Sequence, residues 1–350
     1  MSKKQNVNPN SIRNIGEFGL ISKINSMISS DVSDDIVLHL GDDTAAIRIT
    51  ENKLTLITCD IQIENQHFIR NDIAPFDLGR RAVAINLSDI AAMGGIPTYA
   101  MISLGLPPNY DYREFEKLYQ GFIDQCKQFD VTIVGGNLSQ SDPNLIIDIT
   151  LLGEIESTHL IRRDRAKPGD RIFVTGELGL SGAGFQILKK FGNQFPANLA
   201  SFVKAHQNPQ PRVLVGQAIA SRKIATSMID VSDGIARDLN HICESSKVGS
   251  VLYKDKLPGM NSLNSILTYI DIDLSSLQLN SGEDYELLFT TDHDISDSII
   301  SDIQSEHGIS ITEIGKIVDA EQGYYMIDNR NISIPLDPEG WDHFKSKGSI

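Results

Sequence analysis

The strongest constraint on the fold comes from residues 80–95, which read RRAVAINLSDIAAMGG. This segment predicts a helix, with Pro75 near its start and the pair Gly94-Gly95 at its end. From Ala82 to Met93 nearly every side chain is small or apolar. Most of the helix surface is therefore expected to be buried, and the helix should lie at the centre of the molecule.

Two polar side chains, Asn86 and Asp89, interrupt this apolar run and share one face because they are three residues apart. A buried carboxylate is costly without a cationic or hydrogen-bonding partner, and the run contains no Lys or Arg. For a single Asp, a helix cap or an ion pair with a distant Arg is the simpler interpretation. Similar carboxylates elsewhere in the chain favour a metal ion as the partner.

Composition limits the class of protein. The 350 residues suggest about two domains, and the net charge of −15 argues against nucleic acid or an anionic membrane as a partner. A phosphate ligand stays compatible, since bound divalent ions can reverse the local charge. The three cysteines form no CxxC pair, and because the first residues are polar we expect no signal peptide. We therefore expect a cytoplasmic protein with reduced cysteines.

Carboxylate or amide side chains recur at the ends of predicted strands and helices. They occupy positions 42/43, 60, 89, 137, 230/233 and 283/284. Oxygen donors of this kind suit Mg²⁺ or Ca²⁺, whereas zinc would require clustered Cys and His. Several carboxylates around more than one metal ion suit phosphoryl transfer. The sequence thus predicts a Mg²⁺-dependent enzyme acting on phosphates, without a P-loop or the protein-kinase motifs.

Two further segments leave alternatives open. The glycine-rich loop 176–184 precedes a predicted helix and could bind phosphate through backbone N–H groups, although it matches no established fingerprint. The basic segment 162–170 is either a solvated linker or an anion-binding clamp. We predict a domain boundary beside it, which gives an N-terminal domain of residues 1–156 and a C-terminal domain of residues 157–350.

Five segments, in this order, resemble the thiamine-monophosphate kinase family, within the superfamily of aminoimidazole ribonucleotide synthetase. They are Gly41-Asp42-Asp43, Asn86–Gly94, Arg165–Asp170, Asp230–Gly234 and Gly282–Leu287. The resemblance extends over nearly the whole chain, from about Gly16 to Phe344. Five ordered motifs, some of six or more residues, make it specific.

The resemblance implies a two-domain α+β fold. The N-terminal sheet domain would mediate formation of a homodimer, and the C-terminal domain would be an α/β sandwich. ATP would bind between the domains with several Mg²⁺ ions. The reaction would be direct, in-line transfer of the γ-phosphoryl group of ATP to thiamine monophosphate, giving thiamine diphosphate. No strong base is required, because the acceptor is already a phosphate oxygen.

The resemblance also implies roles for single residues. The expected metal ligands are Asp43, Thr58, Cys59, Asp60, Asp89, Asn137, Asp230 and Asp233. The expected ATP contacts are Tyr119, Gly136, Asn137, Arg163 and Ser232. The expected substrate contacts are His67, Glu283 and Trp341, whose indole would offer a flat apolar face to the aromatic rings.

Three positions depart from the family pattern. Asn137 replaces an Asp, Cys59 stands where Thr is usual, and Ser281 replaces the first of two glycines before Glu283. We expect Asn137 to weaken one Mg²⁺ site without abolishing turnover. Two alternatives to the kinase are another ATP-using synthetase of the same superfamily, and a Mg-ATP-binding protein with little turnover.

Overall fold

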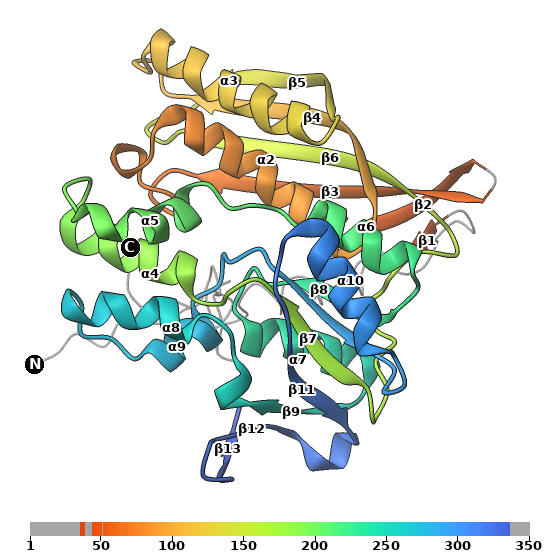
Figure 1. The fold of residues 1–350 in the computed structure, drawn as a ribbon. Helices are drawn as coiled ribbons and strands as arrows, with labels where there is room; N and C mark the ends of the chain where they lie inside the picture. The colour runs from red at the N-terminus through yellow and green to blue at the C-terminus, as the bar shows by residue number, and fades with distance from the viewer. Residues whose placement is uncertain (1–35, 39–43, 51, 337–350) are drawn as a thin grey trace, which may run out of the picture.

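The computed structural model describes residues 36–38, 44–50 and 52–336 and contains two sheets (Figure 1). The first sheet has the strand order β1-β2-β3-β6-β4-β5. Its strands are β1 (Ile36–Leu38), β2 (Ala45–Thr50), β3 (Lys53–Ile63), β4 (Ile96–Leu106), β5 (Thr132–Gln140) and β6 (Ile146–Glu156). Strands β4 and β5 pair in parallel, and the other neighbours pair antiparallel.

Helices α2 (Pro75–Ala92) and α3 (Tyr112–Gln128) cover one face of this sheet (Figure 1). The predicted central helix is therefore present, and it ends where Gly94 adopts a positive φ of 76°. Buried and accessible residues alternate along β3, so Leu54 and Leu56 face the helices while Cys59 and Ile61 face away. A short 3₁₀ turn, η1 (Arg70–Asp72), precedes α2.

Helices pack closely against α2 on two sides. A Cβ at Gly79 of α2 would lie 2.2 Å from the carbonyl oxygen of Leu118 in α3. A Cβ at Gly216, in α6 (Val213–Ser221), would lie 2.2 Å from the carbonyl oxygen of Ala91. Only glycine permits these approaches, so α2 is enclosed by α3 on one side and by α6 on the other.

The second sheet has the order β13-β12-β9-β11-β7-β10-β8. Its strands are β7 (Arg171–Thr175), β8 (Ala225–Asp230), β9 (Gly249–Tyr253), β10 (Leu287–Thr291), β11 (Ile311–Val318), β12 (Tyr324–Ile327) and β13 (Ser333–Pro335). Helix α7 (Ile235–Ser246) packs on one face, where Leu288 points, and the other face contributes Leu287 to the core around α2 and α6. Helix α10 (Asp297–His307) lies beside α6 and packs into the same core.

Further helices form a group beside this sheet, at the left of Figure 1. They are α4 (Leu180–Phe191), α5 (Ala200–Gln207), α8 (Met260–Leu263) and α9 (Leu274–Asn280), with the 3₁₀ turns η2 (Ala197–Leu199) and η4 (Asn264–Thr268). The turns η3 (Lys254–Lys256) and η5 (Ala320–Gln322) border the second sheet. No helix within the described residues is long and apolar enough to cross a membrane.

The two-domain α+β prediction is confirmed by this arrangement. The first sheet ends with Glu156 and the second begins with Arg171, while the exact boundary at residues 156/157 stays a prediction. One apolar core extends from the first sheet through α2 to Met228 and Phe289 of the second sheet. Helix α2 therefore contacts both halves, and its polar side chains can join groups from each.

Candidate active site

The first part of the site lies where β3 meets α2. Thr58 and Asp60 project from β3 on the face covered by α2, because they alternate with the outward-facing Cys59. The Thr58 hydroxyl donates a hydrogen bond to Asp89 of α2. Oδ2 of Asp60 is buried and has no hydrogen-bond partner among the described residues. Asp89 lies beside Asp60, and the two carboxyls can share a hydrogen bond only when one is protonated.

The second part joins α2 to the second sheet. Ser88 Oγ donates a hydrogen bond of 2.6 Å to Oδ2 of Asp230, the last residue of β8, and both side chains are buried. Burial raises the pKa of Asp230 to about 6, opposed by the Ser88 hydrogen bond and aided by the charge of Asp60. Arg163 lowers this pKa, which places its positive charge near Asp230.

Asp60, Asp89 and Asp230 thus lie together around one helix and fit a bound divalent cation. Burial raises the pKa of Asp60 as well as that of Asp230, so neither carboxylate has enough positive partners to ionise easily. A cation would satisfy the unpartnered Oδ2 of Asp60 and offset the mutual repulsion. Carboxylate oxygens are the donors that Mg²⁺ prefers.

A second acidic group lies at the start of α7. Single ligand atoms of Asp233, Asp238 and His241 all lie within 4.8 Å of one another, close enough to hold a metal ion. Burial, together with Arg163 and Arg237, lowers the pKa of His241 to about 4, so its ring is neutral at pH 7. Nε of Arg237 also lies 3.6 Å from Oδ2 of Asp233. This group therefore mixes possible metal ligands with positive charges that could face an anion.

Glu283 forms the third part of the site. Its Oε1 accepts a hydrogen bond of 2.5 Å from Nη2 of Arg81 in α2, and its Oε2 lies 3.3 Å from Nδ1 of His206. Partial burial raises the pKa of Glu283, but Arg81, His206 and His67 outweigh it and lower the pKa to about 2. The structure thus brings the predicted substrate residues His67 and Glu283 together around Arg81.

Asp284 contacts the glycine-rich loop for which phosphate binding was considered. Its carboxylate accepts hydrogen bonds from the backbone N–H groups of Gly179 and Ser181, at 2.7 and 3.1 Å. These groups belong to the start of α4, where a carboxylate is favourable. Two of the N–H donors that could have held a phosphate are therefore already occupied. Burial, which outweighs these bonds, raises the pKa of Asp284 to about 7.

Comparisons with known proteins identify the family. The model of the "AIR synthase related protein, N-terminal domain" family matches residues 41–155, and that of the corresponding C-terminal domain matches residues 167–328. Thiamine-monophosphate kinase of Bacillus subtilis is 32% identical over 94% of this chain and 99% of the relative. That of Buchnera aphidicola subsp. Schizaphis graminum is 36% identical over 94% and 98%. The chain belongs to the thiamine-monophosphate kinase family.

A solved structure extends the comparison. AaThiL complexed with AMPPCP and TMP is 31% identical, with a TM-score of 0.81, and the match covers 95% of this chain and 98% of that one. The family resemblance carried by the five motifs is therefore confirmed over nearly the full length of both chains. The roles that it implies for single residues stay predictions.

Two of the predicted metal ligands of this thiamine-monophosphate kinase family member lie on the other face of the first sheet. Cross-strand pairing aligns Asp148, Ser103 and Asn137 in one row, and residues directly opposite share a face. Sγ of Cys59 lies 3.2 Å from Oδ1 of Asp148 on that face. The sheet thus separates the side chains of Cys59 and Asn137 from that of Asp60.

Two of the predicted ATP contacts lie near the carboxylates. The backbone carbonyl of Ser232 accepts a hydrogen bond of 2.8 Å from the N–H of Glu283. A predicted ATP contact is therefore bonded directly to a predicted substrate contact. Arg163 acts electrostatically on both Asp230 and His241. An arginine near these groups favours an anion clamp over a solvated linker for this part of the basic segment.

Two more of the predicted ATP contacts, Tyr119 and Gly136, belong to the first sheet and its helix layer. Tyr119 of α3 packs edge-on against Phe122, with ring centroids 5.6 Å apart. Gly136 of β5 lies so close to β4 that a Cβ would come within 1.8 Å of the carbonyl oxygen of Ile102. Asp43 and Trp341, the remaining predicted ligand and substrate contact, lie outside the described residues.

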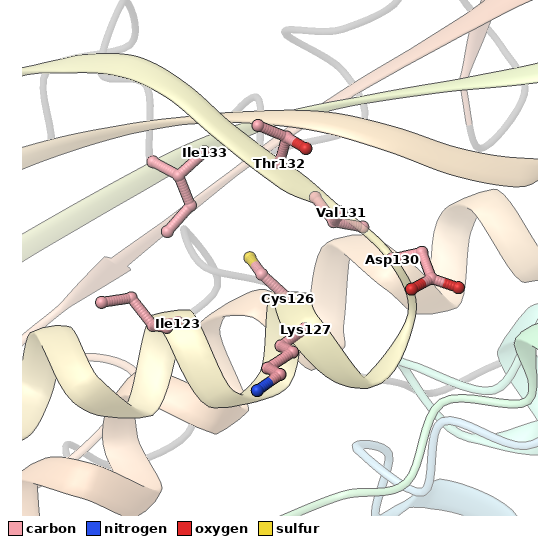
Figure 2. A pocket seen from close by; sticks show the side chains of 7 residues that line it. All are labelled: Ile123, Cys126, Lys127, Asp130, Val131, Thr132 and Ile133. Atoms are coloured by element: carbon pink, nitrogen blue, oxygen red, sulfur yellow. The ribbon is translucent and has the colours of Figure 1, made fainter.

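A cavity of about 460 Å³ lies between the end of α3 and the start of β5 (Figure 2). Its lining residues are Ile123, Cys126, Lys127, Asp130, Val131, Thr132 and Ile133. None of them is a predicted site residue. The candidate site is therefore identified by its converging polar groups and not by this cavity.

Several residues of the site escaped the sequence analysis. They are Arg81, Asp148, His206, Asp238 and His241. For Asp238 and His241 a signal existed, because they are three residues apart on one helix and therefore share a face. Arg81 and His206 gave no such signal, because they contact each other across 125 positions and Arg81 contacts Glu283 across 202 positions.

Proposed function

We propose that this chain phosphorylates thiamine monophosphate with ATP, giving thiamine diphosphate, as a cytoplasmic homodimer that uses several Mg²⁺ ions. One observation carries the proposal: 95% of the chain matches AaThiL complexed with AMPPCP and TMP at 31% identity. AMPPCP is an ATP analogue whose β–γ bridge resists cleavage, so that complex holds a donor analogue and an acceptor together. A kinase of this kind acts mainly by positioning its two substrates and neutralising their charge.

Asp60, Asp89 and Asp230 are the described residues that we assign to Mg²⁺, with Asp233 beside them. Bound Mg²⁺ would neutralise the phosphate oxygens of ATP and of the acceptor. The chain itself supplies carboxylates held in place by Thr58 and Ser88. It also supplies Arg163, whose positive charge lies near Asp230 and suits a phosphate group.

The homodimer is supported by the outer face of the first sheet. Ile61, Tyr99 and Met101 point away from the helices and are 47%, 50% and 41% exposed. Apolar side chains gathered on one exposed sheet face are typical of a protein interface. The three cysteines are all free thiols, which agrees with the proposed reducing compartment.

The test is a product balance. Purified protein is incubated with ATP and Mg²⁺, with and without thiamine monophosphate, and ADP and thiamine diphosphate are measured in the same sample. We expect equal amounts of both products, formed only when the acceptor is present. ADP release without thiamine diphosphate would favour another ATP-using synthetase. ATP binding without ADP release would identify a nucleotide-binding protein with little turnover.

A further inference from the structure

Arg81 is a charged side chain that the structure buries almost completely. Its side chain is 1% exposed, whereas that of its partner Glu283 is 34% exposed. The guanidinium therefore lies behind the carboxylate, and the carboxylate keeps an accessible side. Burial of a guanidinium is costly unless its N–H donors form hydrogen bonds.

Arg81 donates hydrogen bonds to three separate segments of the chain. Nη2 bonds to the Glu283 carboxylate and to the carbonyl oxygen of His67, at 2.5 and 3.3 Å. Nη1 bonds to the carbonyl oxygen of His206 at 2.9 Å. A planar guanidinium can serve partners in several directions at once, which a lysine ammonium does with less directional control. Arg81 thus fixes His67, His206 and Glu283 relative to α2.

The backbone around Glu283 is strained. Glu283 and Tyr285 have positive φ angles of 57° and 50°, a left-handed conformation that L-residues other than Asn and Asp rarely adopt. Such a conformation persists only where the surroundings over-determine it, and it is concentrated at ligand sites. Here the Glu283 N–H donates to the carbonyl of Ser232 while Arg81 and His206 hold the carboxylate. The strained backbone and these contacts therefore fix the Glu283 carboxylate in one orientation.

We propose that Arg81 is a positioning residue of the acceptor site: it directs the accessible side of Glu283 toward the positively charged ring end of thiamine monophosphate. This inference rests on the proposed function. Thiamine monophosphate carries a fixed positive charge on its thiazolium ring, which a carboxylate attracts, and a phosphate on the ethyl side chain of that ring, which a carboxylate repels. The phosphate would therefore lie away from Glu283, beside Asp89 and Asp230, where bound Mg²⁺ would offset the charge of these carboxylates.

Helix α2 sets the spacing between these two ends. Arg81 and Ser88 are seven residues apart, which is about 10 Å along the helix axis. An elongated substrate can span this distance with its rings near Glu283 and its phosphate near Asp230. The same helix would thereby orient the acceptor as well as join the domains.

The test compares Arg81→Lys and Arg81→Gln with Arg80→Gln as the matched control. Arg80 is the preceding residue of α2 and bonds to Asp124, Gln128 and Asn208, away from Glu283. For each protein, kcat and both KM values are measured, and thiamine monophosphate binding is measured by calorimetry. Melting temperatures show whether each variant folds. If Arg81→Gln does not fold, Arg81→Lys, which retains the buried charge, carries the test.

We expect Arg81→Gln to raise the KM and Kd for thiamine monophosphate by roughly 10- to 100-fold, with the KM for ATP changed less than twofold. Arg81→Lys should give a smaller increase, and Arg80→Gln none. An uncharged thiazole ethyl phosphate, without the ring cation, should bind the wild type and Arg81→Gln equally. Equal changes in both KM values, or an unchanged Kd for thiamine monophosphate, would overturn the proposal. If the wild type forms no thiamine diphosphate, the proposed function fails, and the calorimetric comparison still tests Arg81.

Discussion

Ser88 and Asp230 are joined by a buried hydrogen bond of 2.6 Å, although they are 142 positions apart in the chain. Ser88 belongs to the helix that covers the first sheet, and Asp230 ends a strand of the second sheet. The bond therefore ties the orientation of a predicted metal ligand to the packing of the two domains. A change in either partner should affect both stability and metal binding.

Ser88→Ala removes the hydrogen-bond donor and leaves the Asp230 carboxyl buried without it. We expect the free energy of unfolding to fall by about 1–3 kcal/mol, the usual cost of an unsatisfied buried polar group. Urea denaturation in the presence of a chelator measures this without a contribution from bound metal. Ser305→Ala, at an exposed position of α10, is the control and should change the free energy by less than about 0.5 kcal/mol. Equal effects of the two substitutions would contradict the prediction.

Glu283 should give the protein an acid-sensitive contribution to stability. Its folded-state pKa of about 2 lies below the ordinary value of 4.5, so the fold favours the ionised form. This contribution is present above about pH 4.5 and is lost as the pH falls toward 2. The difference in unfolding free energy between the wild type and Glu283→Gln should therefore shrink between pH 5.5 and 3.5. A difference that does not change with pH would show that Arg81 and His206 do not favour the ionised carboxylate.

Arg212 should contribute far more to the free energy of unfolding than Arg222, although both residues flank α6. Arg212 forms hydrogen bonds of 2.7 and 2.5 Å to Glu286, whose side chain is 6% exposed. Arg212→Ala leaves that charge buried and unpaired, and we expect a loss of about 3–5 kcal/mol. Arg222 pairs with the exposed Glu306, so Arg222→Ala should cost less than about 1 kcal/mol. Chemical denaturation of the two variants provides the comparison, and similar losses would refute it.

Asn137→Asp tests the departure from the family pattern. The introduced carboxylate would lie in the same cross-strand row as Asp148, on the face that also carries Cys59. We expect the Mg²⁺ concentration that gives the half-maximal rate to decrease, because a charged ligand binds the ion more tightly than an amide. Asn331→Asp, in an exposed turn, controls for the change in net charge. An unchanged or higher Mg²⁺ requirement would mean that position 137 does not face a metal ion.

Much of the fold could be predicted from local patterns. The apolar run with Pro75 near its start and Gly94-Gly95 at its end predicted α2, which the structure places at Pro75–Ala92. The five motifs identified the family because each is a continuous stretch of residues that resembles the family pattern. These signals are local, so a single sequence displays them directly.

The partners within the site could not be predicted in the same way. A metal ion was the favoured partner of Asp89, and the structure adds the Thr58 hydroxyl. Glu283 was assigned to the substrate, and the structure adds Arg81 behind it. Hydroxyls and buried arginines carry no signature in sequence, because their role depends on which distant strand or loop packs beside them.

The sheet face on which the Cys59 and Asn137 side chains lie was likewise not predicted from the sequence. Both were placed in one metal shell with Asp60, because family motifs record positions along the chain and not the sheet face of each side chain. Alternation along β3 already implied that Cys59 and Asp60 point in opposite directions. The sheet face on which the Asn137 side chain lies follows only from the pairing of Asn137 with Ser103. No sequence pattern predicted that register.

The spacing of contacts along α2 restricts which insertions and deletions this helix can accept during evolution. Arg81 and Ser88 reach different partners from the same rigid cylinder, in which each residue is rotated by about 100° from the previous one. An insertion or deletion of one residue between them would turn one set of side chains away from its partners while the other stayed in place. Lineages that descend from this sequence can therefore substitute residues in this stretch, but they should retain its length.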